Sequence, residues 1–424
     1  MNTILKNAKN HIGLNHLFDP EATYDLLIVD GKIHEIAENI PEKMAQRIIR
    51  CDNCLLLPGF IDVHVHFREP GFEYKETIKT GSESAAAGGF TTVCTMPNLD
   101  PAPWDMTGLK VQMQAIKTDA CMRVIPYGRI TRPSGSGSVV ADLEEMAPYV
   151  FAFSDDGAGV QQDELMEEAM KRAKDLGKII VAHSEDTNYA PHDPRSEWKQ
   201  VKRDLDLVAK TGCSYHVCHV STRESLELIA EGKKSGLDVT CETAPHYLVF
   251  SKADIEKRIS DLGSASGGRF KMNPPIRTEQ DKEALLQAVA DGTVDMIATD
   301  HAPHSSEEKS GGFEKSMNGI LGLETAFPVM YTSLVEGGVI DMSRLIELMS
   351  TNPAKRFSIE GGVIEAGKAA DIAVVDLNEE FHIDPAAFKS KGRSTPFEGM
   401  KVRGKVKCTI SEGNIVYNSL TKDF

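Results

Sequence analysis

The sequence predicts an α/β protein: a (β/α)8, TIM-like barrel with a small β-sandwich domain built from both chain termini. Three observations support this prediction. Strand-like and helix-like segments alternate between residues 58 and 352, the pattern of parallel β/α units. Short strand-like segments occupy both ends of the chain, and polar residues collect where the predicted strands of the middle end. We therefore expect residues 1–57 and 353–424 to form the small domain, and residues 58–352 to form the catalytic barrel.

The predicted small domain draws on both ends of the sequence. Near the N-terminus, strand-like segments cover 24–29, 33–36 and 47–57, with an Asp-Gly-Lys turn at 30–32 between the first two. Near the C-terminus, residues 370–375 and 402–417 have the same character. Strands from both ends would then pair beside the barrel.

The middle of the chain contains eight candidate strands, as a closed barrel requires. They are Phe60–Phe67, Thr91–Met96, Arg123–Gly128, Tyr149–Ser154, Ile179–His183, Ser214–Val220, Asp238–Glu242 and Met296–Thr299. Several are apolar runs, as expected of strands that are buried on both faces. The helical patterns between them cover Lys75–Ala87, Thr107–Lys117, Leu165–Leu176, Arg203–Lys210, Arg223–Lys234 and Gln280–Ala290.

The overall composition excludes several classes of protein. The 424 residues are 41% hydrophobic and 26% charged, which is ordinary for a globular protein. A net charge of -16 argues against binding to nucleic acid or to an anionic membrane. Residues 1–19 lack the apolar segment of a signal peptide, and no apolar run approaches the ~20 residues of a membrane span. We expect a cytoplasmic protein.

The cysteines are read as free thiols. The 8 cysteines are scattered, and several lie in apolar runs, as expected of buried thiols in a reducing compartment. Cys51 and Cys54 form a Cys-x-x-Cys pair, but no second pair follows at the spacing of a zinc ribbon. We therefore interpret this pair as structural, with a metal or redox role as the alternative.

The first predicted barrel strand carries the most informative motif. In residues 58–70, apolar residues alternate with Asp62, His64, His66 and Arg68. Alternating residues of a strand share a face, so the two imidazoles and the guanidinium should lie on one side. Two such imidazoles can bind one metal ion, and the arginine could hold an anionic substrate beside it.

The remaining strand ends supply further candidate ligands. Active sites of this barrel collect at the carboxyl ends of the strands. The polar residues found at those ends are His64, His66, Asn98, Asp155, Asp156, His183, His219, His246, Asp300, His301 and His304. Four imidazoles and two carboxylates would suit a pair of zinc-like ions, which would activate water and polarise a carbonyl group. A carboxylate at the last strand could then move the proton to a leaving nitrogen.

Each candidate also has a structural alternative. Alternation alone does not decide whether Asp155 or Asp156 is the ligand, since either could cap the following turn. We assign His216 a structural role and His301 a supporting role behind the ligands. His246 follows Pro245, and contact with the substrate is the alternative to a structural role. The long charged segment 305–315 is a candidate lid.

Taken together, these motifs resemble the class I bacterial dihydroorotases of the amidohydrolase superfamily. The resemblance covers the whole chain and rests on DVHVHFREPG (62–71), TMPN (95–98), FSDDG (153–157), HVCHVS (216–221), KMNPP (271–275) and ATDHAPH (298–304). It implies the reversible hydrolysis of (S)-dihydroorotate to N-carbamoyl-L-aspartate, the third step of pyrimidine synthesis. It also implies two Zn²⁺ ions per subunit, with Mn²⁺ or Co²⁺ as substitutes.

The resemblance also implies a role for individual residues. The implied metal ligands are His64, His66, Asp156, His183, His219 and Asp300, with Asp156 bridging the ions and Asp300 acting as the catalytic acid and base. The implied substrate contacts are His66, Arg68, Asn98, Asn273, His304 and Gly319. Of these, Arg68, Asn98 and His304 would hold the substrate carboxylate. A homodimer is expected, and association with aspartate transcarbamoylase is a further expectation.

Two alternative functions are weighed. The first is another cyclic amidohydrolase, an allantoinase or a hydantoinase, but such enzymes typically bridge their metals with a carboxylated lysine, which the fourth strand end lacks. The second is a non-catalytic amidohydrolase-like scaffold, but such proteins have lost metal ligands that are present here. Dihydroorotase activity is therefore the favoured hypothesis.

Overall fold

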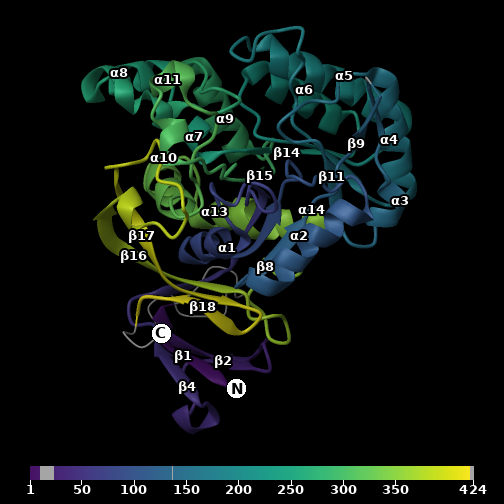
Figure 1. Cartoon of the computed structure of the whole chain (residues 1–424). Helices are drawn as coiled ribbons and strands as arrows, with labels where there is room; N and C mark the ends of the chain where they lie inside the picture. Colours follow the sequence, from purple (N-terminus) through teal and green to yellow (C-terminus); the bar gives the residue numbers. More distant parts are fainter. Residues whose placement is uncertain (10–22, 136, 421–424) are drawn as a thin grey trace.

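The described chain contains two sets of β-strands, one from its middle and one from its two ends (Figure 1). The computed structural model describes residues 1–9, 23–135 and 137–420. All eight strands predicted in the middle form, several of them shorter than expected. They are β6 (Phe60–Val65), β7 (Phe90–Thr95), β8 (Arg123–Pro126), β11 (Ala152–Ser154), β12 (Ile179–Ala182), β13 (Tyr215–Val217), β14 (Val239–Thr243) and β15 (Met296–Ile297).

These eight strands pair in parallel in two sheets. One sheet has the order β6-β7-β8 and the other β11-β12-β13-β14-β15. Two isolated parallel bridges, Val65–His301 and Gly128–Phe153, link the edges of the two sheets. The α/β architecture with parallel strands is thus present, whereas one closed barrel stays a prediction.

Helices connect the parallel strands, as predicted. The longer ones are α1 (Ile78–Ala87), α2 (Met106–Asp119), α4 (Asp163–Asp175), α5 (Arg195–Thr211), α6 (Arg223–Lys234), α8 (Lys252–Leu262) and α9 (Glu279–Asp291). Figure 1 shows α4, α5 and α6 packed side by side on the outside of the strands. The first helix begins three residues later than predicted, because Thr77 caps it by accepting a hydrogen bond from the backbone N–H of Thr80.

Shorter elements complete the middle of the chain. They are the hairpin β9 (Thr131–Ser134) and β10 (Gly137–Val140), and the helices α3 (Leu143–Met146), α7 (Pro245–Val249), α10 (Ser306–Lys309), α11 (Gly312–Lys315), α12 (Ala326–Met330), α13 (Met342–Ile346) and α14 (Asn352–Phe357). The candidate lid is therefore partly helical, because α10 and α11 lie within it.

The strands from both ends of the chain share one sheet, at the lower end of the molecule in Figure 1. They are β1 (Thr3–Lys9), β2 (Thr23–Val29), β3 (Lys32–Ala37), β4 (Arg47–Arg50), β5 (Leu55–Pro58), β16 (Ile372–His382), β17 (Lys401–Ser411) and β18 (Asn414–Asn418). The N-terminal β5 pairs antiparallel with the C-terminal β16, which joins the two ends. The pairing of both termini is thus observed, while a sandwich and the boundaries at residues 57 and 352 stay predictions.

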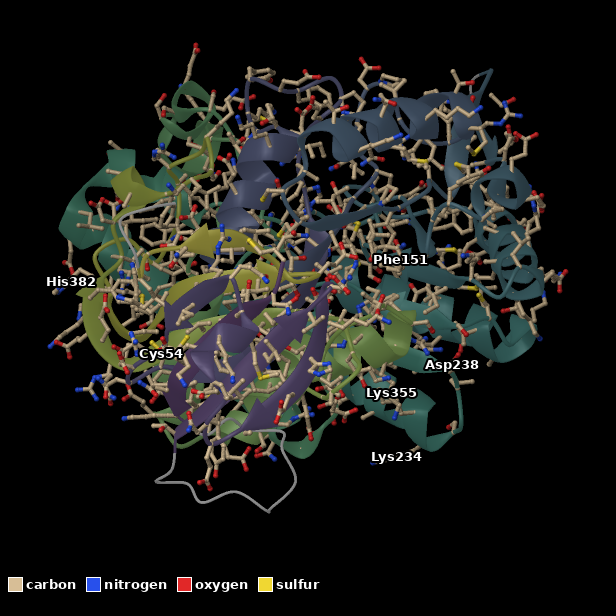
Figure 2. All side chains as sticks on the ribbon, turned by 90° about the horizontal axis from the view of Figure 1, so that it is seen from below. Cys54, Phe151, Lys234, Asp238, Lys355 and His382 are labelled. Carbon is tan, nitrogen blue, oxygen red and sulfur yellow. The ribbon has the colours of Figure 1, made fainter. Side chains whose placement is uncertain are left out.

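Helix α14 packs at the amino ends of several of the parallel strands. Phe357 packs against Phe151, which precedes β11, and against His216 of β13. Arg356 forms an ion pair with Asp238, which precedes β14. Figure 2, seen from below, shows Phe151, Asp238 and Lys355 of α14 on the same side of the molecule. This leaves the opposite, carboxyl ends of the strands for a functional site.

The cysteines are free, as predicted. Cys121 is exposed, and the other seven are buried. Cys51 and Cys54 lie in the core of the terminal sheet, and burial raises the pKa of Cys54 to about 11. Residues 10–22 of the N-terminal stretch lie outside the described part of the chain. Among the helices that are described, none has the length and apolar character needed to cross a bilayer.

Candidate active site

A cavity of about 320 Å³ lies at the carboxyl ends of the parallel strands and gathers the predicted site residues. Of the eleven residues that the sequence analysis named as ligands or substrate contacts, all but His64 line it. The ones that do are His66, Arg68, Asn98, Asp156, His183, His219, Asn273, Asp300, His304 and Gly319. His64 is fully buried behind this lining. Residues from many separate strand ends therefore meet in one cavity.

The first cluster in the cavity consists of His64, His66 and two carboxylates. The Nε2 atoms of His64 and His66 lie 3.3 and 3.4 Å from the carboxylate oxygens of Asp156. The same two Nε2 atoms lie 3.5 and 3.1 Å from Oδ1 of Asp300. Three of these side chains, His64, His66 and Asp156, lie close enough together to hold one divalent cation, and Asp300 lies beside them.

A second cluster shares Asp156 with the first. Oδ1 of Asp156 lies 3.5 Å from Nδ1 of His183 and 3.5 Å from Nε2 of His219. Those two nitrogens are themselves only 2.9 Å apart. Because Asp156 belongs to both clusters, its carboxylate stands where it could bridge two cations.

Two buried acceptors orient the imidazoles of the first cluster. Nδ1 of His64 lies 2.6 Å from Oε1 of Glu242, and Nδ1 of His66 lies 2.9 Å from Oδ1 of Asn98. A carboxylate only accepts, so Nδ1 of His64 donates, and when the ring is neutral its Nε2 has a free lone pair that faces Asp156. Such support behind a histidine is typical of metal sites. Glu242 also contacts His216 at 3.1 Å, which agrees with the structural role predicted for His216.

The residues present fit a bound cation. Among the described residues, Nε2 of His64 and Oδ1 of Asp156, which face each other at 3.3 Å, are buried without a hydrogen-bond partner. Buried polar atoms in proteins nearly always have a partner, so such a group of unsatisfied atoms points to a missing ligand. Neutral imidazole and carboxylate donors suit Zn²⁺, Mn²⁺ or Co²⁺.

The electrostatics of this half of the cavity are dominated by its carboxylates. Burial opposes a charged imidazole, yet Asp156 and Glu242 outweigh it and raise the pKa of His64 well above its usual value. Burial likewise opposes a charged His183, but Asp156 and Glu185 raise its pKa to about 9. Burial would raise the pKa of Asp300, but the surrounding imidazoles hold it far below its usual value. The clustered groups therefore strongly favour positive charge between them.

The structure distinguishes the two neighbouring aspartates that sequence reasoning left open. Asp155 accepts hydrogen bonds from the backbone N–H groups of Ile130 and Thr131, from the hydroxyl of Thr131 and from the guanidinium of Arg129. Its oxygens are thereby satisfied in the loop after β8. Asp156, in contrast, faces the imidazoles.

Three residues of the site have an unusual backbone. Arg68, His219 and Asp300 have φ angles of 61°, 33° and 49°, in the left-handed region that non-glycine residues rarely adopt. Each follows a parallel strand, where the turn aims its side chain at the cavity. Such strain is concentrated at functional sites. Arg68 corrects the alternation argument, because β6 ends at Val65 and this turn, not the strand face, brings the guanidinium beside His66.

The other half of the cavity is positively charged. Nε of Arg68 donates to the carbonyl oxygen of Pro303 at 3.2 Å, and Nη2 lies 3.4 Å from Nε2 of His304. Nζ of Lys75 lies 3.3 Å from Nδ1 of His304. Burial, assisted by the charges of Arg68 and Lys75, lowers the pKa of His304 to about 4. This half suits an anionic group.

Asn273 and Gly319 complete the lining. The amide nitrogen of Asn273 donates to Glu185 at 2.9 Å. The N–H of Gly319 donates to the carbonyl oxygen of Lys271 at 3.0 Å. A Cβ at position 319 would lie 2.5 Å from the carbonyl oxygen of Ala302, and φ is 137°, so only glycine fits there.

The sequence was compared with protein families and with individual known proteins. The sequence profile of the amidohydrolase family matches residues 55–416. The chain belongs to the amidohydrolase family. A relative from Fusobacterium nucleatum named dihydroorotase is 45% identical over 98% of both chains, and one from Bacillus cereus is 43% identical over 98% of both. A dihydroorotase of Lactobacillus leichmannii is 44% identical over 93% of this chain and 94% of its own.

Solved structures of other amidohydrolases have the same fold. An L-hydantoinase from Arthrobacter aurescens superimposes with a TM-score of 0.85 and 27% identity, covering 98% of this chain and 96% of its own. A D-hydantoinase gives a TM-score of 0.86 and 25% identity, covering 99% and 96%. The fold is therefore shared with the hydantoinases, whereas the sequence is nearer to the dihydroorotases.

Two of the remaining histidines of this amidohydrolase lie outside the cavity lining. The ring of His301 turns away from it, with Nδ1 accepting from the N–H of Gly322 at 3.3 Å and Nε2 lying 3.6 Å from Glu76. This agrees with the supporting role predicted for His301. His246 is buried and is absent from the lining, and burial lowers its pKa to about 4.

Sequence reasoning missed three charged residues of this amidohydrolase. Glu242 was placed only as the end of a strand, although an acidic residue in an apolar strand was a signal. Glu185 contacts His183 at 2.8 Å and also holds Asn273, and it follows His183 by two residues. The sequence places Lys75 only at the start of a predicted helix, and no signal in the sequence marks it as a lining residue.

Proposed function

We propose that this amidohydrolase is a dihydroorotase, which hydrolyses (S)-dihydroorotate reversibly to N-carbamoyl-L-aspartate. The observation that carries the proposal is the division of one cavity into a cation-binding half and an anion-binding half. Dihydroorotate offers a cyclic amide for the first half and a carboxylate for the second. The identities of 43–45% to relatives named dihydroorotase support the same assignment.

We propose that His64 and His66 hold one divalent ion and that His183 and His219 hold a second, with Asp156 shared and Asp300 beside the first. Zn²⁺ is the expected ion, with Mn²⁺ or Co²⁺ as substitutes. When bound, such ions would supply Lewis-acid activation of a water and of the scissile carbonyl group. Glu242 and Asn98 keep the Nε2 lone pairs of His64 and His66 directed at this site.

Asp300 is the proposed catalytic acid and base. Its low pKa keeps it ionised before the reaction, so it can accept the proton of the attacking water. As the water oxygen bonds to the carbonyl carbon, that proton passes to Asp300, which then delivers it to the ring nitrogen as the amide C–N bond breaks. The nitrogen thus leaves neutral, and Asp300 regains its charge.

The opposite half of the cavity would bind and orient the ring. We propose that Arg68 and His304 hold the substrate carboxylate, together with the amide nitrogen of Asn98, whose oxygen is engaged by His66. Asn273 and the backbone at Gly319 would contact the pyrimidine ring. His66 would touch both metal and substrate.

Further proposals concern the assembly. We propose that the two parallel sheets act as a single (β/α)8 barrel and that the terminal sheet forms a separate small domain of the sandwich type. A cytoplasmic homodimer, and docking to aspartate transcarbamoylase, are the assemblies that the family resemblance suggests.

Substrate selectivity tests the proposal. The purified protein, loaded with Zn²⁺, is assayed with dihydroorotate, hydantoin, allantoin and dihydrouracil as parallel substrates. We expect turnover of dihydroorotate and its synthesis from N-carbamoyl-L-aspartate in reverse. Turnover of only the rings without a carboxylate would instead identify a hydantoinase or allantoinase. Less than one bound ion per chain and no turnover of any substrate would identify a non-catalytic scaffold.

A further inference from the structure

Lys75 places an ammonium group in the cavity that the proposed mechanism does not use. It lies in the turn before α1, is only 9% exposed and lines the cavity. Its Nζ forms an ion pair with Oε1 of Glu308 at 2.9 Å and lies 3.3 Å from Nδ1 of His304. The rings of Phe72 and Tyr74 lie 5.7 and 5.4 Å from the same nitrogen. A buried lysine held by so many partners has a defined position.

The contacts of His304 select one tautomer of its ring. A lysine ammonium only donates, so Nδ1 of His304 must accept from Lys75. On the other side of the ring, Nε2 lies 2.7 Å from the carbonyl oxygen of Asn318, which only accepts. Nε2 therefore carries the hydrogen. These two contacts favour the same tautomer. The contact of Nε2 with Nη2 of Arg68 would need Nε2 as the acceptor, but at 3.4 Å it is much longer than the 2.7 Å contact with Asn318.

The alternative is a doubly protonated imidazolium that donates from Nδ1 to Oε2 of Glu308, at 3.3 Å. Two positive groups, Arg68 and Lys75, face the ring and disfavour this charged form. Glu308 is already engaged by Lys75 and by the N–H of Ser305. The neutral ring with hydrogen on Nε2 is therefore the form that the neighbouring groups favour.

The tautomer matters because Nε2 is the atom that faces the proposed binding site of the substrate carboxylate. It lies 3.4 Å from Nη2 of Arg68, so an oxygen of a bound carboxylate could accept from both, sharing or replacing the carbonyl oxygen of Asn318 as the acceptor of the Nε2 hydrogen. With the hydrogen on Nδ1 instead, Nε2 would present a lone pair to that carboxylate and repel it. Control of the proton on His304 therefore decides whether this half of the cavity attracts an anion.

We propose that Lys75 is a positioning residue that holds His304 as the Nε2–H tautomer and thereby prepares the subsite for the substrate carboxylate. Through Glu308 it also ties His304 to α10, at the start of the candidate lid. The inference rests on the proposed dihydroorotase function, because it concerns the residue that would recognise the carboxylate.

The test compares KM and kcat for dihydroorotate in the Zn²⁺-loaded wild type, Lys75→Met, Lys75→Arg and the matched control Lys79→Met. Lys79 is exposed on α1. Loss of the donor in Lys75→Met should raise KM by about 10-fold or more while kcat changes by less than about 3-fold. Lys75→Arg keeps a donor and should recover part of the loss. Lys79→Met should match the wild type.

A double-mutant cycle with His304→Ala separates action through His304 from other effects. If Lys75 acts through His304, adding Lys75→Met to His304→Ala should change KM by less than about 2-fold. An equal rise in KM in both backgrounds would overturn the inference, because Lys75 would then contact the substrate directly or support the fold. If Lys75→Met does not fold, Glu308→Gln replaces it in the same cycle, with the same two outcomes.

The two proposals fail in different ways. A wild type that does not turn over dihydroorotate contradicts the proposed function before any variant is compared. A wild type that is active, together with an unchanged KM in Lys75→Met, contradicts the role of Lys75 and leaves the function intact.

Discussion

The two halves of the cavity use the same side chain in opposite electrostatic settings. His64 and His183 face Asp156, with Glu242 and Glu185 behind them, and these carboxylates raise the pKa of both imidazoles. His304 faces Arg68 and Lys75, and burial, together with these two charges, lowers its pKa to about 4. The carboxylates of the first half therefore attract positive charge, either a proton or a metal ion, whereas the imidazole of the second half stays neutral and can donate to an anion.

This difference teaches that the neighbours of a histidine decide its role more than its place at a strand end does. His183 and His304 follow parallel strands and border the cavity, and His64, near the end of β6, is buried behind its lining. A substrate that is a cyclic amide with a carboxylate needs a cation-binding half and an anion-binding half, separated by about one ring. The cation-binding half alone could hydrolyse an amide but would not select a substrate with a carboxylate. The anion-binding half alone could bind a carboxylate but would have no means of hydrolysis.

The largest effect is expected from removing the carboxylate of Asp300. Asp300→Ala should lower kcat for dihydroorotate by about 10³-fold or more, because general acid–base catalysis alone contributes about 10²–10⁴-fold. Steady-state kinetics in both directions of the reaction measure this loss. Bound metal is determined in the same preparation, so that loss of an ion is distinguished from loss of the proton carrier. A kcat within about 10-fold of the wild type would contradict the assigned role.

The anion-binding half of the cavity is tested by removing the guanidinium of Arg68. Arg68→Ala should raise KM for dihydroorotate by about 30- to 100-fold, since hydrogen bonds to a charged group contribute about 2–3 kcal/mol. The effect on kcat should be much smaller, and the affinity for metal should not change. An unchanged KM would show that the carboxylate binds elsewhere.

The support behind the metal ligands should have a more moderate effect. Glu242→Gln removes the carboxylate that accepts from Nδ1 of His64. Substitutions of this kind reduce metal affinity by about 10- to 100-fold, so we expect weaker Zn²⁺ binding in a competition titration with a chelator. Turnover at saturating Zn²⁺ should largely recover. Wild-type affinity in this variant would mean that Glu242 does not orient the ligand.

Periodicity and the parallel β/α pattern predicted the strands and most of the site, because strand ends of this fold meet at one place. All eight central strands formed, and ten of the eleven named residues line one cavity. The first strand, β1, was missed because its residues TILKNAK mix polar and apolar side chains without strict alternation. Its burial comes from pairing with β2 and β4, which is a tertiary effect.

The three site residues that the sequence did not predict were missed for the same physical reason. Lys75, Glu185 and Glu242 act through other side chains and come from a turn, a loop and a strand interior. Sequence patterns place a residue on an element, but they do not show which partner across the fold it contacts. The aspartate pair illustrates this limit, since only the hydrogen bonds of Asp155 in the loop after β8 separate it from Asp156.

The smallest expected effect is a pH dependence of stability from His304. Its pKa is about 4 in the folded protein and 6.5 as its ordinary value, so the unfolded chain binds more protons between these pH values. The free energy of unfolding should therefore rise with pH from about 4 to 6.5 and gain nothing further from this group above 6.5. Burial is the largest cause of the lowered pKa, Arg68 and Lys75 add to it, and the contacts with Asn318 and Glu308 act in the opposite direction.

Denaturant unfolding of the wild type and of His304→Asn across this pH range measures the effect. The wild type should lose more stability on acidification, by up to about 3 kcal/mol. Parallel curves for the two proteins would show that His304 is not held neutral by its neighbours.

A crystal structure with Zn²⁺ and N-carbamoyl-L-aspartate would test most directly the division of the cavity into two halves. Anomalous scattering at the zinc edge should locate two ions, one beside His64 and His66 and one beside His183 and His219, with Asp156 between them. The α-carboxylate of the ligand should lie against Arg68 and His304. A ligand bound in the reverse orientation, with that carboxylate at the ions and no anion at Arg68, would contradict the account.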